Sequence, residues 1–222
     1  MSKDPTTEQP VPKRLHTYYR STASWRVRIA LNLKGIPADH IFHHLRKGEQ
    51  RAPDYLRVNP QGLVPSLELE DGTVLTQSLA ICEWLDETHP EPSLLSGSAV
   101  ERARTRAFAL AIACDIHPVQ NLKVLARLRS MSVPESEVTG WARWVIEGGL
   151  AACEVLLAET AGPFCFGKTP TLADVCLVPQ LFNARRFGAY VGGFTRLLAA
   201  EEACNELPAF AQAAPDRQGD AE

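Results

Sequence analysis

The fold is decided by YYRSTASWRVRIAL, residues 18–31, in which a short apolar strand passes into a helix through a turn rich in hydroxyl groups. The first turn of a helix presents unpaired main-chain N–H groups and about half a positive charge, so it can bind an anion. Ser21, Thr22 and Ser24 gather at that end, and Arg20 precedes them. Taken alone, the stretch favours an ordinary N-cap followed by solvated arginines, with an anion site as the alternative.

The composition is that of a globular protein, and 222 residues suffice for one large or two small domains, of which we favour two. The formal net charge of −3 gives no electrostatic reason to expect nucleic acid as a partner. The longest apolar runs, such as residues 108–114, are far too short to span a bilayer, and residues 1–13 are polar rather than signal-like. We therefore expect a cytoplasmic protein with a flexible N-terminal segment at 1–13, binding neither nucleic acid nor membrane.

The cysteines and histidines do not form a metal-binding pattern. Six cysteines stand singly in apolar segments without a C-x-x-C pair, which argues against a zinc site or a disulfide framework. We expect most of them to be small buried hydrophobes. They are Cys82, Cys114, Cys153, Cys165, Cys176 and Cys204. His43 and His44 adjoin on an expected strand, so they point to opposite faces and are structural or exposed.

The first ninety residues predict a small mixed domain, β-α-β followed by β-β-α. Gly35 stops the first helix, Asp71-Gly72 is a strong hairpin signal, and Ser78 is the expected N-cap of the second helix. Residues 46–57 are charged with little periodicity, and we take them as a loop with one helical turn. The expected strands are 14–18, 40–45, 66–70 and 73–76, and the expected helices are 25–34 and 79–88.

The remaining residues predict an all-helical domain. Residues 91–98 are rich in proline, serine and glycine and form the expected linker, so the domains are placed at 14–90 and 99–222. The fold class is therefore α+β. The expected helices are 99–131, 135–158, 171–187 and 195–203.

Two features of the second domain have specific mechanics. Thr171 stands three residues before Asp174 at the head of an apolar run, the spacing of a capping box, which is a structural device. Pro118 falls inside the expected helix 99–131, where it should kink the helix or free carbonyl groups. Such a kink either turns polar side chains towards the other domain or is a plain bend.

Together these elements resemble the cytosolic glutathione transferases, whose fold is a thioredoxin-like N-terminal domain followed by an all-α C-terminal domain. The run RSTASWRVRIAL at 20–31 is similar to the signature of the zeta class, whose namesake activity is maleylacetoacetate isomerase. The resemblance extends from residue 15 to about residue 215. Further matching runs are QSLAI at 77–81, PVQNL at 118–122, TLAD at 171–174, LVPQ at 177–180 and RF at 186–187.

The resemblance implies roles for individual residues. Ser21 would donate its hydroxyl to the glutathione sulfur with Thr22 beside it, and Val64, next to an expected cis Pro65, would bind the cysteinyl part. Gln77 and Ser78 would hold the γ-glutamyl carboxylate at a helix N-terminus, the place that local physics also favours. Arg186 and Arg20 would bind the carboxylates of the substrate. Further implied glutathione contacts are Gln50, His117 and Asn121.

The chain departs from the zeta pattern in two places. Ala23 replaces the cysteine of the signature, so no thiol is available there for a catalytic or redox role. His117 replaces a glutamine that belongs to the dimer-side glutathione contact. The related bacterial maleylpyruvate isomerases also have Asp-Ile-His-Pro at this place, residues 115–118 here, and a signature without the cysteine. Both maleylacetoacetate and maleylpyruvate remain open as substrates.

The implied function is a glutathione-dependent cis–trans isomerase acting as a homodimer in aromatic-acid or tyrosine breakdown. The glutathione thiolate adds to the cis double bond, the bond rotates, and elimination returns glutathione with the fumaryl product. Lowering a thiol pKa by about two units needs about 2.7 kcal/mol, which one charged hydrogen bond and a helix terminus can supply. The alternatives are a general glutathione transferase or dehalogenating enzyme that consumes glutathione, and a non-catalytic binding module.

Overall fold

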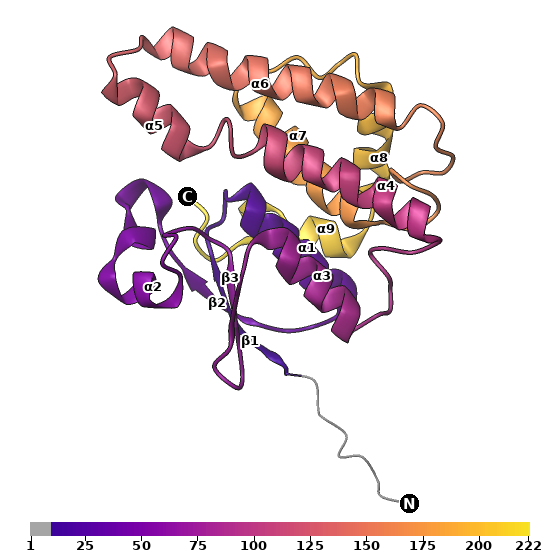
Figure 1. The fold of residues 1–222 in the computed structure, drawn as a ribbon, viewed down its shortest axis with the longest axis horizontal. Coiled ribbons are helices and arrows are strands. Elements are labelled where there is room, and N and C mark those ends of the chain that lie inside the picture. Colours follow the sequence, from indigo (N-terminus) through magenta and orange to yellow (C-terminus); the bar gives the residue numbers. More distant parts are fainter. Residues whose placement is uncertain (1–9) are drawn as a thin grey trace, which may run out of the picture.

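The computed structural model describes residues 10–222. Of the expected flexible segment 1–13, residues 1–9 lie outside the described residues, and residues 12 and 13 belong to the first strand, so the expectation is wrong for these two. A four-stranded sheet of order β2-β1-β3-β4 forms the centre of the N-terminal half (Figure 1). β1 pairs in parallel with β2 and antiparallel with β3, and β3 pairs antiparallel with β4. The strands are β1 (Pro12–Thr17), β2 (Asp39–Phe42), β3 (Ser66–Leu69) and β4 (Val74–Thr76). The predicted β-α-β and β-β-α order is confirmed.

The charged segment after β2 is more regular than its sequence suggests. Our prediction of a strand over 40–45 is wrong beyond Phe42, because His44 Nδ1 accepts a hydrogen bond from the Lys47 N–H and starts a 3₁₀ turn. A second 3₁₀ turn, Glu49–Arg51, and helix α2 (Pro53–Val58) follow. The expected helical turn is present as α2, which buries Tyr55, but the two 3₁₀ turns before it were not predicted.

Helix α1 (Thr22–Lys34) begins with Ser21 as its N-cap and ends at Gly35, whose φ of 65° suits a residue without a side chain. Both arginines of its first turns are buried, Arg26 being 1% and Arg28 2% exposed, so the expectation of solvated arginines is wrong. Arg28 donates hydrogen bonds to Tyr18 O and Tyr19 O, which fixes the turn before the helix.

The C-terminal end of the chain returns to this turn. Helix α9 (Pro208–Ala213), which we did not predict, packs against α1 (Figure 1). The Arg28 Nε donates to Ala213 O over 3.0 Å, and the Tyr19 N–H donates to Asp220 Oδ2 over 3.0 Å. Arg28 of α1 and the C-terminal end of the chain therefore together hold the turn that carries Ser21.

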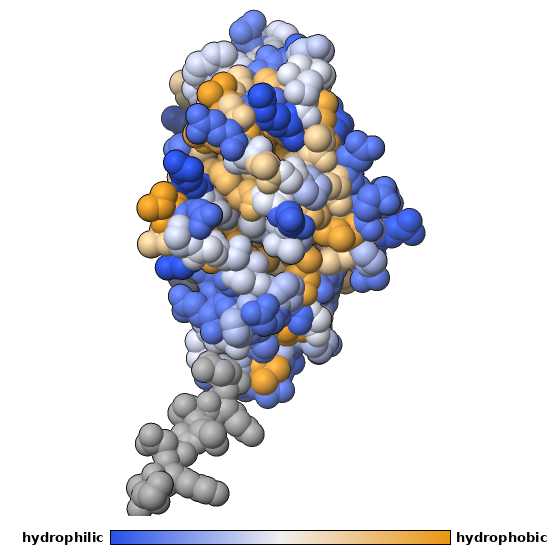
Figure 2. All heavy atoms as spheres, turned by 90° about the vertical axis from the view of Figure 1, so that its right-hand side faces the viewer, coloured by the Kyte–Doolittle hydropathy of each residue, from blue (hydrophilic) through white to orange (hydrophobic). Residues whose placement is uncertain are grey.

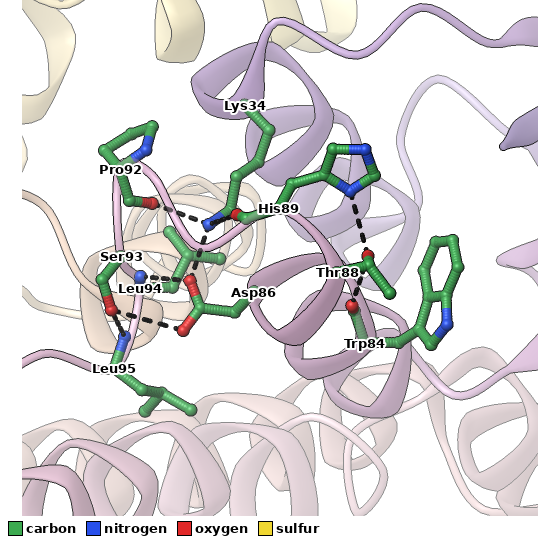
Figure 3. Close-up of polar contacts among 9 residues, drawn as sticks. All are labelled: Lys34, Trp84, Asp86, Thr88, His89, Pro92, Ser93, Leu94 and Leu95. Carbon is green, nitrogen blue, oxygen red and sulfur yellow. Dashed lines mark hydrogen bonds and ion pairs between the residues drawn. The ribbon is translucent and has the colours of Figure 1, made fainter. Parts of the chain in front are cut away.

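Helix α3 (Ser78–Thr88) is joined to α1 and to the linker through one buried ion pair. Its N-cap is Gln77, in the left-handed region with φ of 68°, so our choice of Ser78 as N-cap is wrong by one residue. Lys34 Nζ, at the end of α1, lies 2.6 Å from Asp86 Oδ1 and also donates to the carbonyl groups of His89 and Pro92 (Figure 3).

The second half is helical, as predicted, but the expected helix 99–131 is interrupted. It divides into α4 (Ala99–Leu110), a π-helical turn (Ala111–Ile116) and α5 (Leu122–Ser130), because Pro118 cannot donate a main-chain hydrogen bond. Gly149 accommodates the π-helical turn, since a Cβ there would lie 2.3 Å from Ile116 Cγ1. The other helices are α6 (Glu135–Leu156), α7 (Leu172–Arg186) and α8 (Thr195–Asn205), each within two residues of its predicted ends.

Helix α7 is the central helix of the core and packs against both α1 and α4. The predicted pairing at its start is confirmed, because Asp174 Oδ2 accepts hydrogen bonds from the Thr171 N–H at 2.8 Å and from its hydroxyl at 2.9 Å. Five of the six cysteines are buried and Cys114 is exposed, which confirms the expectation for most of them. None of the helices between residues 10 and 222 is both long and apolar enough to cross a membrane.

Candidate active site

A cleft of about 840 Å³ opens between the two halves of the molecule. Its walls come from the turn before α1, the charged segment before α2, the stretch before β3, the residues around Pro118, and α7. Most of the residues that the sequence nominates line it: Arg20, Ser21, Thr22, Gln50, Val64, His117, Asn121 and Arg186. Pro65, Gln77 and Ser78 do not line the cleft.

The cleft is strongly cationic. Six arginine and lysine side chains line it, and no aspartate or glutamate from residues 10–222 does, although the chain as a whole has a net charge of −3. The basic side chains are Arg20, Arg46, Lys47, Arg51, Lys123 and Arg186. Four of these were missed from the sequence. For Arg46, Lys47 and Arg51 the signal was the charged stretch 46–57, which we interpreted as a loop with one helical turn, and no such signal marks Lys123. This arrangement suits a ligand with more than one negative charge.

Ser21 caps α1 with its side chain. Its Oγ accepts a hydrogen bond from the Ser24 N–H over 3.1 Å, and its carbonyl oxygen accepts from the Trp25 N–H over 2.9 Å. Because Oγ acts here as the acceptor, the single hydroxyl hydrogen remains for another acceptor. Ser21 can therefore cap the helix and donate a hydrogen bond into the cleft at the same time. Thr22 Oγ1 is buried and has no hydrogen-bond partner within residues 10–222.

The stretch before β3 lines one wall of the cleft with residues 61–64. Val64–Pro65 is a cis peptide bond, as expected, and Val64 lines the cleft while Pro65 does not. Gln77 donates through Nε2 to Gln61 Oε1 over 3.0 Å, and Gln61 is a lining residue. Gln77 therefore contacts the cleft wall through Gln61. Ser78, the first residue of α3, accepts a hydrogen bond at Oγ from Arg26 over 3.2 Å.

Arg186 reaches the cleft from the end of α7. Burial and then the positive charges of Arg20 and Arg46 lower the pKa of its guanidinium, so these three cations act on the same region. No carboxylate from the described part of the chain pairs with Arg186, whose nearest polar contact is Asn183 Oδ1 at 3.3 Å. Arg185 beside it pairs with Glu201. Arg186 is thus available for an anionic ligand.

His117 and Asn121 line the opposite wall. Burial and then the charge of Arg26 lower the pKa of the His117 imidazole, so His117 is neutral at pH 7 and acts as a hydrogen-bonding group, not a cation. Asn121 is the N-cap of α5, where its Oδ1 accepts a hydrogen bond from the Lys123 N–H over 3.3 Å. Its side-chain NH₂ group remains for a ligand.

Comparison with known proteins identifies the family of the chain. The profile for the N-terminal domain of glutathione S-transferase matches residues 20–88, and the profile for the C-terminal domain matches residues 124–211. The chain belongs to the glutathione S-transferase family, in its zeta class. It is 46% identical to maleylacetoacetate isomerase from Pseudomonas aeruginosa over 209 residues, 93% of this chain and 98% of that protein.

Two solved structures of zeta-class relatives support this assignment. The holo structure of a bacterial maleyl pyruvate isomerase of the zeta class superimposes with a TM-score of 0.91 at 43% identity, covering 94% of this chain and all of that one. Maleylacetoacetate isomerase from Anaeromyxobacter dehalogenans, with dicarboxyethyl glutathione and citrate in its active site, gives a TM-score of 0.87 at 43% identity, with 97% and 96% covered. The resemblance and the two-part fold expected from the sequence are therefore confirmed.

Proposed function

We propose that this zeta-class protein is a glutathione-dependent cis–trans isomerase of maleyl keto acids, either maleylacetoacetate or maleylpyruvate. The observation that carries the proposal is the cleft itself. It is lined by six cations and by no carboxylate within residues 10–222, and Ser21 stands in it at a helix N-terminus. Glutathione and a maleyl keto acid each carry two carboxylates, so both are anions that suit such a lining.

The residues present fit glutathione. Ser21 has a hydroxyl hydrogen to spare, and Ser78 stands at the start of α3 beside a buried arginine. Val64 lines the cleft and makes no main-chain hydrogen bond within residues 10–222. Further contacts that we assign to glutathione are Gln50, Pro65, Gln77, His117 and Asn121. When bound, glutathione supplies a thiolate that adds reversibly to the maleyl double bond and leaves again after the bond has rotated.

The role that we assign to Ser21 is to stabilise the thiolate. A hydrogen bond to a charged group contributes about 1.5–3 kcal/mol, and the N-terminus of α1 adds about 0.3–1 kcal/mol. Together they match the roughly 2.7 kcal/mol that lowers a thiol pKa by about two units. Thr22, next to Ser21 in the first turn, is the second hydroxyl assigned to the catalytic site.

The role that we assign to Arg186 and Arg20 is to bind the substrate carboxylates. An arginine holds a carboxylate through two parallel hydrogen bonds, and fixed cations also stabilise the enolate charge that develops during addition. The Arg186 guanidinium lies close to other cations and has no carboxylate partner within residues 10–222, which suits a residue that binds an anion.

We further propose a cytoplasmic homodimer with domains at 14–90 and 99–222 and a linker at 91–98. α3 ends at Thr88 and α4 begins at Ala99, which supports the domain bounds. Free cysteines suit a reducing compartment.

Val100 and Leu110 of α4 are exposed, and hydrophobic side chains lie between hydrophilic ones on the face shown in Figure 2. Such apolar surface favours association. A monomer in analytical ultracentrifugation would overturn the dimer.

A side-by-side assay of maleylacetoacetate and maleylpyruvate tests the function. We expect isomerisation of at least one acid to its fumaryl product, with an absolute requirement for glutathione. Glutathione binding without turnover of either acid, or of a chloro-aromatic electrophile, would instead support a non-catalytic binding module. Turnover of the electrophile alone would support a general transferase.

A further inference from the structure

Arg26 is a buried cation whose charge no internal anion balances. It is 1% exposed, and its NH1 donates to Ser78 Oγ over 3.2 Å. Its Nε and NH2 have no hydrogen-bond partner within residues 10–222, and no carboxylate of that part of the chain lies within ion-pair distance. An isolated buried charge is costly, so a cation left in this state points to an anion that is supplied from elsewhere.

Arg28, two residues further along α1, shows that burial alone does not explain Arg26. Arg28 is 2% exposed, yet its guanidinium donates hydrogen bonds to four oxygens, those of Thr17, Tyr18, Tyr19 and Ala213. It is a structural arginine that joins three segments. Arg26 has one such contact, and that contact is a serine at the start of a helix.

The contact with Ser78 sets the direction of its hydroxyl group. Ser78 is the first residue of the eleven-residue helix α3, whose N-cap Gln77 makes no side-chain capping hydrogen bond, so the first N–H groups of α3 remain open. Since Ser78 Oγ accepts from Arg26, its hydroxyl hydrogen is left to donate elsewhere. The helix terminus, the oriented hydroxyl and the buried cation all favour one anion at the same place.

The charge of Arg26 also acts on a residue that lines the cleft, His117. Burial lowers the pKa of His117 most, and the positive charge of Arg26 lowers it further. Arg26 also acts on the thiols of Cys82 and Cys176, which burial holds neutral. Neither thiol supplies a negative charge, and no carboxylate of residues 10–222 forms an ion pair with Arg26.

We propose that Arg26 is a positioning residue for the γ-glutamyl carboxylate of glutathione. It acts through Ser78, by holding the hydroxyl so that its hydrogen points to the carboxylate, and through its own uncompensated charge. The inference rests on the proposed function, because it assumes glutathione as the ligand. In the absence of glutathione the same charge destabilises the folded protein.

Arg26→Met, with Arg26→Lys and Ser78→Ala as companions, tests this inference. The measurements are the melting temperature without ligand and the glutathione dissociation constant by calorimetry. We expect Arg26→Met to melt no lower than the unmodified protein, yet to bind glutathione at least about tenfold more weakly. Arg26→Lys keeps the charge and should recover part of the affinity. In the Ser78→Ala background the further loss on removing Arg26 should be clearly smaller, because the two residues act together.

Two outcomes would overturn the inference. A lower melting temperature or failure to fold for Arg26→Met would show a structural arginine like Arg28. Unchanged glutathione affinity in a folded Arg26→Met protein would show that the charge does not act on the ligand. Both leave the proposed function intact. Failure of the unmodified protein to bind glutathione would instead overturn the proposed function, and this inference with it.

Discussion

The hydroxyl oxygen of Ser21 accepts a hydrogen bond from the Ser24 N–H over 3.1 Å at the start of α1. One side chain therefore begins the helix and is also the hydroxyl that we assign to the glutathione thiolate. The helix fixes the hydroxyl in place, since a cap that moves would leave main-chain N–H groups unpaired.

Ser21→Ala should remove most turnover, by about tenfold to a hundredfold, because the hydroxyl contributes about 1.5–3 kcal/mol of the preference for the thiolate. The glutathione dissociation constant should stay within about tenfold, since other residues hold the tripeptide. Steady-state kinetics and calorimetry measure the two effects. Unchanged turnover would transfer the role to Thr22.

Ser98→Ala is the matched control for Ser21→Ala. Ser98 caps α4 in the same way, accepting from the Glu101 N–H over 3.3 Å, but it does not line the cleft. Each substitution should lower the free energy of unfolding by about 0.5–2 kcal/mol. Only Ser21→Ala should affect turnover, and an equal loss in both variants would mean that helix capping alone explains the result.

Arg186→Lys should raise the KM for the maleyl acid by about tenfold with a smaller change in kcat, because an ammonium point charge replaces a bidentate hydrogen-bond donor. Arg185→Lys is the neighbouring control, since Arg185 pairs with Glu201 and is not a lining residue. Steady-state kinetics on both variants measure the difference. If Arg186→Lys leaves the KM unaltered, Arg186 has only a structural role.

Lys34→Met should lower the free energy of unfolding by about 3–5 kcal/mol, because it leaves Asp86 without its cation in a largely buried position. The side chain of Lys34 is fully buried and that of Asp86 is 12% exposed. Urea denaturation measures the change. Arg57→Met breaks the exposed pair with Asp54 and should cost less than about 1 kcal/mol. Similar costs for the two variants would contradict the role of the buried pair shown in Figure 3.

The stability of the protein should fall as the pH drops below about 6.5, the usual pKa of histidine. Burial lowers the pKa of both His16 and His43, so the unfolded chain takes up protons at a higher pH than the folded one does. Their ring nitrogens lie 2.9 Å apart, and one must accept for the contact to form.

His43→Gln tests this pH dependence. Between about pH 6.5 and 5 the free energy of unfolding should depend less steeply on pH than in the unmodified protein, by up to about 1.4 kcal/mol per pH unit. Urea denaturation across this range measures both slopes. Equal slopes would show that His43 does not contribute to the loss of stability.

The sequence predicted those parts of the fold that local patterns control. The strand, turn and helix order around residues 18–31 follows from periodicity and caps, and the pairing of Thr171 with Asp174 follows from spacing alone. The break near Pro118 was foreseen, but its form was not. A π-helical turn depends on Gly149 of a distant helix giving room to Ile116, and no local pattern encodes that contact.

The candidate site was predicted through the family resemblance, and its electrostatics were not. Arg46 and Lys47 belong to a charged stretch whose composition resembles that of a solvated loop, and only the fold turns them towards the cleft. The burial of Arg26 was also missed, because a charged residue in the first turn of a helix is ordinarily exposed. Which face of a helix is buried is a tertiary property.

The ratio of fumaryl product to glutathione consumed tests the central claim most directly. The protein is incubated with a maleyl keto acid in large excess over glutathione, and free thiol and product are both measured at completion. An isomerase that returns glutathione in each cycle gives many product molecules per glutathione, with the free thiol recovered. One turnover per glutathione, with the thiol lost to a stable conjugate, would contradict the account.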